Sequence, residues 1–526
     1  MRSRTSTTAV VYVTVAVTYS TFRSCAAFAD SPVWGWRRPL SSCLAASRTD
    51  AECQMTRDAL SIVDHAIQAV DPYKAVQKHL KFGENGCLTT TTSGDNKPKE
   101  YSHQDFDEIV LIAFGKASSA MAKSCVDRLR ESTASPWSRV PLRGVVLVKD
   151  DHATKAELTT LSEANIRVME ASHPVPDERS ALGAQSILEL LEDTETSTTE
   201  RSLVLCCISG GGSALFCGPR LPLTLDDLRR TNQALLASGM TIQQMNVVRK
   251  RLETGKGGRL AAAAHPGTVL TLVLSDILGD PLDLIASGPT VPDPSTFDDA
   301  WQLIQNHDAS LREQIPESVL ELLQDGLEGR VDDTPNQDHP VFEKTETVLV
   351  GNNELAVLAA AEQARAKGYH PVVLGTRIEG EARHVAGVYT AMAQHLASGG
   401  RHAAATLPAA LIGGGETTVT LTPGSGKGGR NQELALAAGL QLHQFGLRNV
   451  VLASAGTDGT DGPTDAAGAV VDGGTVERLQ GSAEQALQRH DAYNYLDQQE
   501  EDGHSPLIKT GPTGTNVADV CVTLIQ

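Results

Sequence analysis

Apolar residues along this chain form short unbroken runs, each followed at once by glycine or serine. The first clear run, EIVLIAF at residues 108–114, precedes Gly115 and the helix-like stretch 117–130. Such a run is typical of a strand buried on both faces of a parallel sheet, where strands alternate with helices. Six strand-to-loop units of this kind predict doubly wound α/β sheets. The other five runs are residues 201–208, 268–274, 346–350, 409–412 and 449–455.

The chain is long enough for two domains, because 526 residues exceed what one hydrophobic core normally organises. An acidic, helical stretch between about Pro292 and Pro340 separates the first strands from the last ones. We therefore predict a larger, Rossmann-like domain over residues 51–335 and a smaller domain over residues 340–526. Each is expected to be a mostly parallel sheet flanked by helices. A ligand site is expected in the cleft between them, where strand ends meet.

The charge balance narrows the range of partners. The 45 basic and 64 acidic residues give a formal net charge of -19, and this field would repel a nucleic acid. We therefore expect a small-molecule substrate, and neither a nucleic acid nor a membrane as partner. The low aromatic content of 4% and the 46 glycines fit an α/β enzyme with glycine-shaped loops. Formation of a homodimer stays open.

The first fifty residues differ from the rest and resemble a targeting leader. Arg2 and Arg4 precede a weakly apolar run from Thr8 to Phe22, and no acidic residue occurs before Asp30. The run is short for a bilayer span and is interrupted by Thr and Ser, so a membrane anchor is the weaker interpretation. Import into a plastid, import into a mitochondrion and a wrongly assigned start all stay open. The mature protein is expected in the cytoplasm or an organelle.

The strongest chemical signal is a run of three glycines between a buried strand and a helix, in CISGGGSALF at residues 207–216. Without Cβ atoms the backbone amides can surround an anion, and a helix start adds its positive dipole end. Taken alone, the loop is either a phosphate cradle or a tight turn that serves only helix–sheet packing. Its candidate phosphate-binding residues are Ser209, Gly210, Gly211, Gly212 and Ser213.

The second predicted domain repeats this device, which favours the phosphate interpretation. IGGGETTVTL, residues 412–421, again places three glycines after an apolar run, and the next loop carries Lys427 and Arg430 into a helical pattern. A glycine-rich loop with two cations in an acidic protein is a candidate anion site. We favour Arg430 as its functional cation. The candidate nucleotide-binding residues here are Gly414, Gly415 and Glu416.

Further cations stand out against the acidic background. Lys116 lies at the end of the strand 108–114, one glycine beyond it. A lysine there can neutralise a transferring phosphoryl group, although a lone lysine at this place is more often a surface residue. The segment VVRKRLETGKGGRL, residues 247–260, is densely basic, and some of its cations must be ordinary helix-surface residues. Its candidate substrate-binding residues are Arg249, Lys256 and Arg259.

Phosphoryl transfer also needs carboxylates that hold Mg²⁺ or orient the hydroxyl group. Asp276 comes one residue beyond the strand 268–274, and Asp458 comes shortly after the strand 449–455. Aspartates in such loops are often no more than turn residues. We select Asp276 and Asp458 as catalytic and metal-binding candidates because each is the carboxylate nearest its strand end.

Eight strings occur in an order that resembles one family. They are FGKAS, ASHPVPDERS, SGGGSAL, MNVVRKRLETGKGGRLA, LSDILGDPLDLIASGPT, GGGETTVTL, GKGGRNQELALA and SAGTDGTDGPTDAAGA. From about Ala51 to its end the chain is similar to the class II glycerate kinases, which carry a C-terminal domain called MOFRL. The resemblance implies phosphorylation of D-glycerate by ATP and Mg²⁺ to give 2-phosphoglycerate, with Lys116 and Arg430 in the active site. It also implies that a T-G-T-N-x-x-D string lines the cleft, here with Gly514, Thr515, Asn516 and Asp519.

Two other functions stay open. Some members of this family have been labelled hydroxypyruvate reductases, but the chain lacks a nicotinamide fingerprint with an acidic ribose partner. A non-catalytic metabolite-binding protein would have no need of the lysine, arginine and aspartate set.

Overall fold

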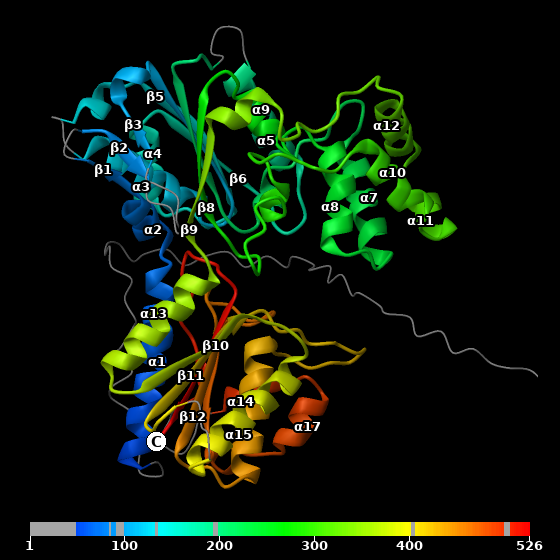
Figure 1. Ribbon diagram of the computed structural model, residues 1–526. Helices are drawn as coiled ribbons and strands as arrows, with labels where there is room; N and C mark the ends of the chain where they lie inside the picture. The colour runs from blue at the N-terminus through cyan, green and yellow to red at the C-terminus, as the bar shows by residue number, and fades with distance from the viewer. Residues whose placement is uncertain are drawn as a thin grey trace, which may run out of the picture.

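The protein forms two lobes, each built around a six-stranded sheet, that lie one above the other in the computed structural model (Figure 1). The predicted leader lies outside the described residues, apart from its last two. No helix in the described part of the chain is long and apolar enough to cross a membrane. The structure describes residues 49–83, 86–90, 99–131, 135–192, 198–400, 405–498 and 505–526.

The upper lobe contains an all-parallel sheet in the order β6-β5-β4-β7-β8-β9. Its strands include the predicted apolar runs, and alternate side chains of β4 pack on opposite faces. Leu111 joins the core under α3 (Ser118–Arg130), whereas Ile112 joins the core under α5 (Glu178–Glu192). The doubly wound prediction is confirmed for this lobe. The strands are β4 (Glu108–Phe114), β5 (Leu142–Lys149), β6 (Ile166–Ala171), β7 (Ser202–Ile208), β8 (Thr268–Leu274) and β9 (Thr345–Gly351).

Shorter helices complete the cover of this sheet. At α4, for example, Thr154 and Glu157 form a capping box that satisfies amides of the first turn. The helices besides α3 and α5 are α2 (Pro72–His79), α4 (Lys155–Glu163), α6 (Gly212–Leu215) and α9 (Arg259–Ala263).

A helical bundle with its own hydrophobic core projects from the side of the upper lobe (Figure 1). It includes most of the acidic stretch that the sequence suggested as a separator between domains. The bundle consists of α7 (Leu225–Ala237), α8 (Ile242–Leu252), α10 (Phe297–Gln305), α11 (Ala309–Gln314) and α12 (Glu317–Leu327).

The lower lobe contains a mixed sheet in the order β10-β11-β15-β12-β13-β14. Strands β10, β11, β12 and β14 run in one direction, and β13 and β15 run in the other. Helices α14 (Ala382–Ala397) and α15 (Arg430–Gln444) share a core with one face of it. Small helices α16 (Thr475–Arg478), α17 (Ala483–Gln488) and α18 (Ala492–Leu496) lie nearby. The strands are β10 (His370–Ile378), β11 (Ala409–Gly415), β12 (Val450–Gly456), β13 (Gly468–Asp472), β14 (Leu507–Ile508) and β15 (Asp519–Ile525).

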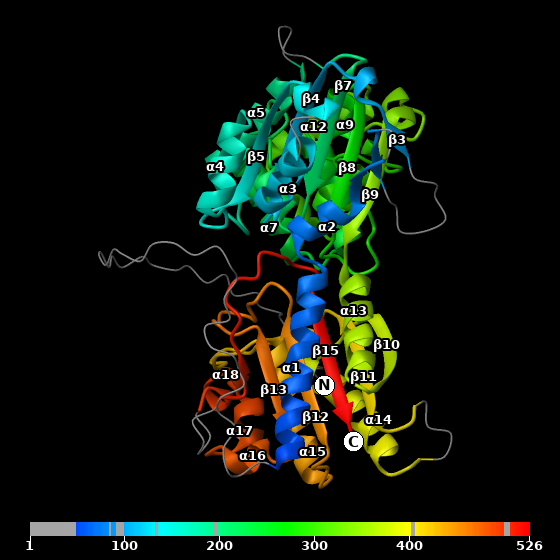
Figure 2. The same ribbon diagram turned by 90° about the vertical axis from the view of Figure 1, so that its left-hand side faces the viewer.

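The path of the chain differs from the two continuous domains that we predicted. Helix α1 (Asp50–Ala69) belongs with the lower lobe, where it packs on α13 (Asn353–Ala366), β12 and β15 (Figure 2). Strand β9, which we placed in the second domain, completes the upper sheet. The reason is that an apolar pattern predicts that a helix face or a strand is buried, but it does not identify the element that packs against it. The chain therefore crosses between the lobes twice, near Val70 and after Gly351.

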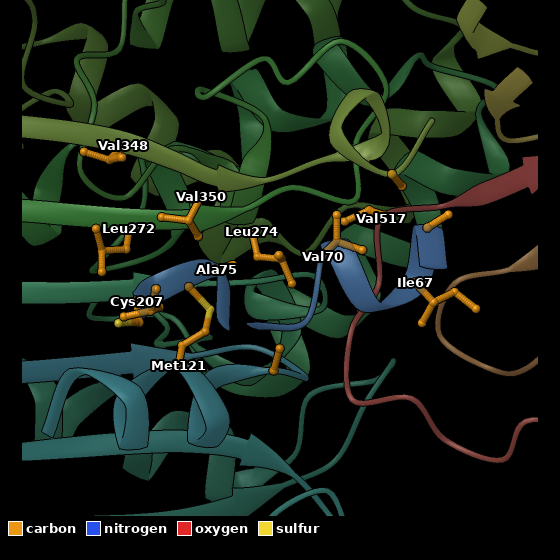
Figure 3. Close-up of a cluster of buried hydrophobic side chains, with 14 of the residues drawn as sticks. Ile67, Val70, Ala75, Met121, Cys207, Leu272, Leu274, Val348, Val350 and Val517 are labelled. Atoms are coloured by element: carbon orange, nitrogen blue, oxygen red, sulfur yellow. The ribbon is translucent and has the colours of Figure 1, made fainter. Parts of the chain in front are cut away.

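The two crossings lie together in one hydrophobic cluster that extends through both lobes. Val70 from the first crossing, Leu274 at the end of β8 and Val517 of the lower lobe are buried close to one another (Figure 3). Thr515 strengthens this junction, because its hydroxyl group donates a hydrogen bond of 2.7 Å to the carbonyl of Val70. The junction holds the strand ends of the upper sheet against the lower lobe.

A small antiparallel sheet covers β9 from outside, formed by β1 (Leu80–Phe82), β2 (Leu88–Thr90) and β3 (Glu100–Tyr101). Thr90 and Tyr101 both donate hydrogen bonds to Glu346 of β9, at 2.7 and 2.5 Å. The ends of the predicted surface insertion, residues 83–102, are thus attached to the fold, and much of its middle lies outside the described residues.

Candidate active site

The ends of neighbouring parallel strands place several candidate residues at one level of the upper sheet. Phe114 of β4 pairs with Ile208 of β7, which pairs with Val273 of β8. The chain segments that follow these three residues therefore start side by side. They bring together Lys116, the Ser209–Ser213 loop and Asp276.

The first glycine-rich loop turns sharply and is held by the loop after β4. The amide of Lys116 donates to the carbonyl of Gly210 at 2.9 Å, and the amide of Ala117 donates to the Ser209 hydroxyl oxygen at 3.0 Å. Gly211 has φ of +79°, in the left-handed region that favours glycine. In the described part of the chain, the amides of Gly210 and Gly211 donate to no protein acceptor. Two amides are thus available to an anion.

The helix after this loop, α6, contains only four residues, from Gly212 to Leu215. The predicted contribution of a helix dipole is therefore small, and the amides themselves carry the anion-binding capacity of the loop. Ser213 points elsewhere: the ammonium group of Lys256 donates to its carbonyl at 3.0 Å and to its hydroxyl group at 2.9 Å.

Asp276 lies directly against the first glycine-rich loop. A Cβ atom on Gly210 would overlap with its carboxylate, and Asn516 of the lower lobe donates a hydrogen bond of 3.3 Å to the same group. Burial raises the pKa of Asp276 to about 6, and the charges of Glu416 and Asp458 act in the same direction, while Lys116 opposes them. A buried carboxylate among other carboxylates is a favourable place for a cation.

The lower lobe brings Asp458 to Lys116. The Lys116 Nζ and Asp458 Oδ2 atoms are 3.9 Å apart, and each side chain is about a quarter exposed. The other oxygen, Oδ1, accepts hydrogen bonds from the amide and hydroxyl group of Thr460, both at 3.0 Å. These bonds orient Asp458 so that its free oxygen faces the upper lobe.

Arg430 begins helix α15 and is held by two carboxylates. Its Nε and Nη2 atoms donate to Asp519 at 2.6 and 2.9 Å, and its Nη1 atom lies 2.9 Å from Glu416. The raised pKa of Glu416 comes first from burial, with Asp519 and Asp458 adding to it and Arg430 opposing it. The two hydrogen bonds to the Asp519 carboxylate fix the orientation of the guanidinium group. Glu416 therefore takes part in the site through its side chain.

The second run of glycines differs from the loop that we predicted. Gly414 and Gly415 lie inside strand β11, where their backbones pair with Val520 and Asp519 of β15. A Cβ atom on Gly414 would overlap with Asn353 of helix α13. The geometry therefore favours a packing role for these glycines.

The basic segment near residue 250 lies apart from these groups. Arg249 donates to Asn232 at 2.7 Å in the helical bundle, and Arg259 donates to the carbonyl of Asp332 at 3.0 Å. Lys256 is buried and forms an ion pair of 2.6 Å with Glu253. The structure does not bring these three cations to Lys116, and Lys256 instead supports the glycine-rich loop through Ser213.

Two residues near the site were absent from our candidates, and a third was implied by the resemblance alone. Lys149 ends β5 beside β4, and His173 follows β6 and lies against the first glycine-rich loop. Asp519 begins β15 and holds Arg430. The signal for Lys149 was a charged residue at the end of an apolar run. His173 lies in one of the eight strings that supported the resemblance, and Asp519 lies in the T-G-T-N-x-x-D string that the resemblance implied.

Comparisons with known proteins identify the family of this chain. A family model described as a domain of unknown function, DUF4147, matches residues 58–324, and the MOFRL family model matches residues 409–519. The Glycerate 2-kinase of Pyrococcus horikoshii is 36% identical over 469 residues, which cover 89% of this chain and 96% of that protein.

A second curated relative is the D-glycerate 2-kinase of Thermotoga maritima, which is 37% identical over 473 residues, or 89% of this chain and 97% of that protein. The crystal structure of a Thermotoga maritima glycerate kinase superposes with a TM-score of 0.73 at 35% identity and covers 90% of this chain and 100% of its own. The family predicted from the eight strings is confirmed. The chain belongs to the family of glycerate kinases that join a DUF4147 domain to a C-terminal MOFRL domain.

Proposed function

We propose that this enzyme transfers the γ-phosphoryl group of ATP to the 2-hydroxyl group of D-glycerate and forms 2-phosphoglycerate, with Mg²⁺ as its metal ion. The names of the Pyrococcus and Thermotoga relatives support the substrate and the position of phosphorylation. The side chains of both lobes support the type of reaction, because phosphoryl transfer depends on positioning and on charge neutralisation.

The observation that carries the proposal is the approach of Lys116 Nζ to Asp458 Oδ2, at 3.9 Å. This contact brings the strand ends of the upper sheet and a loop of the lower sheet into one site. In the described residues the Lys116 ammonium group donates no hydrogen bond to protein, so its donors stay available. It can neutralise an incoming phosphoryl group as a point charge.

The amides of Gly210 and Gly211 would hold the phosphates of the nucleotide. Arg430 would neutralise the migrating group from the side of the lower lobe. Asp519 is buried and holds Arg430 through two bonds, whereas Glu416 holds it through one. A phosphoryl oxygen would therefore replace Glu416 and leave the Asp519 pair intact.

The two selected carboxylates fit different tasks. The described residues contain no group of three or more His, Cys, Asp or Glu side chains that could hold a metal ion. This fits Mg²⁺, which is usually held by one or two carboxylates together with substrate phosphates and water. Asp276, beside the free amides, would hold it, and bound Mg²⁺ would neutralise charge on the phosphate oxygens. Asp458 would orient the substrate hydroxyl group and accept its proton as the new O–P bond forms and the bond to ADP breaks.

Identification of the product tests the function. After incubation with ATP, Mg²⁺ and D-glycerate, ³¹P NMR should show 2-phosphoglycerate and ADP in equal amounts. Formation of 3-phosphoglycerate would contradict the position, and no phosphorylated product would contradict the function.

A reductase remains the alternative because a relative from Agrobacterium vitis, 39% identical over 424 residues, bears a provisional hydroxypyruvate reductase name. We expect no oxidation of NADH when hydroxypyruvate is added. A fall in absorbance at about 340 nm that depends on the enzyme would favour the reductase.

Removal of either cation tests the assigned roles. In Lys116→Ala and in Arg430→Ala we expect kcat to fall by about 100-fold or more, because each would lose charge stabilisation of the transition state. Lys155→Ala, at an exposed lysine of the same lobe, serves as the matched control. Near-normal kcat in both active-site variants would contradict the assignment.

A further inference from the structure

A second basic cluster lies beside Lys116, at the ends of β5 and β6. Phe114 pairs with Leu147, so Lys116 and Lys149 follow neighbouring strands at the same level. Parallel strands are about 4.8 Å apart, so the segments that carry the two lysines start from adjacent strands. His173, two residues beyond β6, reaches the first glycine-rich loop, since a Cβ atom on Gly211 would lie 2.9 Å from its ring and 3.4 Å from Lys116 Cγ.

In the described residues of the upper lobe, no carboxylate forms an ion pair with Lys116 or Lys149. The neighbouring carboxylate of Asp150 is occupied by Arg179, which also pairs with Asp177. Across the described residues, Lys149 forms no ion pair or side-chain hydrogen bond, and neither ring nitrogen of His173 has a hydrogen-bond partner. Both groups therefore keep their hydrogen-bonding capacity.

Electrostatics agrees with an anion site at this position. The pKa of Lys149 is lowered, first by burial and then by Lys116, whereas Asp458 and Asp150 oppose the shift. Burial, Lys116, Lys149 and His152 together lower the pKa of His173 to about 4, so its ring is neutral at pH 7 and can donate one hydrogen bond. A bound anion would relieve the repulsion between the two lysines.

The strand order indicates which anion belongs here. Strand β4, which leads to Lys116, lies between β5, which ends at Lys149, and β7, which leads to the loop with the free amides. In an in-line transfer the entering and leaving oxygens lie on opposite sides of the phosphorus atom. If the nucleotide phosphates occupy the β7 side, the acceptor must approach from the β5 side. Asp458, which would orient the acceptor hydroxyl group, also influences Lys149.

We propose that Lys149, with His173 beside it, binds the carboxylate of the substrate. The subsite selects a 2-hydroxy acid over its neutral analogues, and it takes over the task that the sequence suggested for Arg249, Lys256 and Arg259. The identity of the substrate rests on the proposed function. The position of the subsite rests on the strand register and on the unpaired groups.

Calorimetric titration of the whole enzyme with D-glycerate and with glyceramide, its neutral amide, tests this subsite without turnover. In Lys149→Met we expect the affinity for glycerate to fall by about 10- to 100-fold, the effect of losing one charged hydrogen bond. Glyceramide should bind wild type and variant equally, and the KM for ATP should change by less than about twofold. Lys149→Arg should keep most of the affinity for glycerate, and His173→Gln should reduce it less than Lys149→Met does.

Lys155→Met is the matched control, because Lys155 is exposed and lies on the same lobe. An equal loss for glycerate and glyceramide, a loss confined to ATP, or an unchanged affinity for glycerate would each overturn the subsite. If wild type binds glycerate but does not phosphorylate it, the proposed function fails and the subsite stands. If wild type phosphorylates glycerate and Lys149→Met binds it normally, only the subsite fails.

Discussion

This chain contains a run of three glycines at residues 210–212 and another at residues 413–415, each close behind an apolar run. In the upper lobe the strand ends at Ile208, so all three glycines lie beyond the sheet. In the lower lobe strand β11 continues to Gly415, so all three lie within it. The same Gly-Gly-Gly sequence thus forms a loop with free amides in the upper lobe and part of a tightly packed strand in the lower lobe.

The difference comes from the neighbours of each run. Strand β7 lies between β4 and β8, which turn away into loops at the same level, so nothing extends the pairing beyond Ile208. Strand β11 lies beside β15, which pairs with all three of its glycines. The side chains of Tyr389 and Asn353 occupy the space where Cβ atoms would stand. A glycine run is therefore evidence for close approach, and its hydrogen-bond partners decide between ligand and protein.

Among the changes that test this comparison, Gly210→Ala should reduce activity the most. The new methyl group would overlap with the Asp276 carboxylate and displace it from the free amides. We expect kcat/KM to fall by about 10- to 100-fold, because one electrostatic contact of the transition state is lost. Steady-state kinetics at saturating Mg²⁺ checks this.

Gly387→Ala is a suitable control, because Gly387 lies in helix α14 and the nearest atom to a new Cβ would be 3.7 Å away. Full activity of Gly210→Ala would mean that the loop binds no phosphate.

A smaller fall in activity should follow from lowering the pH, because Asp276 beside the first glycine-rich loop becomes protonated. Burial raises its pKa to about 6, and only the ionised carboxylate attracts a cation. The folded pKa is raised, so protonation is favoured as the pH falls through 6, and kcat/KM should then decrease by up to tenfold per pH unit.

Added Mg²⁺ competes with protons for this carboxylate, so higher concentrations should move the acid limb to lower pH. Profiles measured at two Mg²⁺ concentrations check this. If the acid limb of the kcat/KM profile did not shift with Mg²⁺ concentration, the assignment of Asp276 as the Mg²⁺ ligand would be contradicted.

The same contrast explains what the sequence can and cannot predict. Buried parallel strands such as β4 and β8 are apparent from their unbroken apolar runs, and the charged residues after them were found because strand ends of a parallel sheet share one edge. Strand β9 was assigned to the wrong domain because an apolar run such as ETVLV does not reveal which strand it pairs with. Helix α1 was misplaced for the same reason.

The site shows an equivalent limit. Lys116, Asp276 and Asp458 each lie two residues after a strand, so local pattern was enough to select them. Arg249 and Arg259 were selected by charge density alone, but burial gave them partners within the upper lobe. Charge in a sequence does not show whether another part of the chain already neutralises it.

The smallest effect on activity should come from Gly414→Ala in the lower run. Its methyl group would overlap with Asn353, whose amide donates hydrogen bonds of 2.8 and 2.9 Å to the carbonyls of Val517 and Asp519. We expect a loss of about 1–3 kcal/mol in the free energy of unfolding, as for other overpacked cores, seen as a lower urea midpoint. Because no ligand amide is removed, kcat of the folded enzyme should change by less than about threefold. A large fall in kcat with unchanged stability would show instead that this strand binds phosphate, and the two glycine runs would then serve the same purpose.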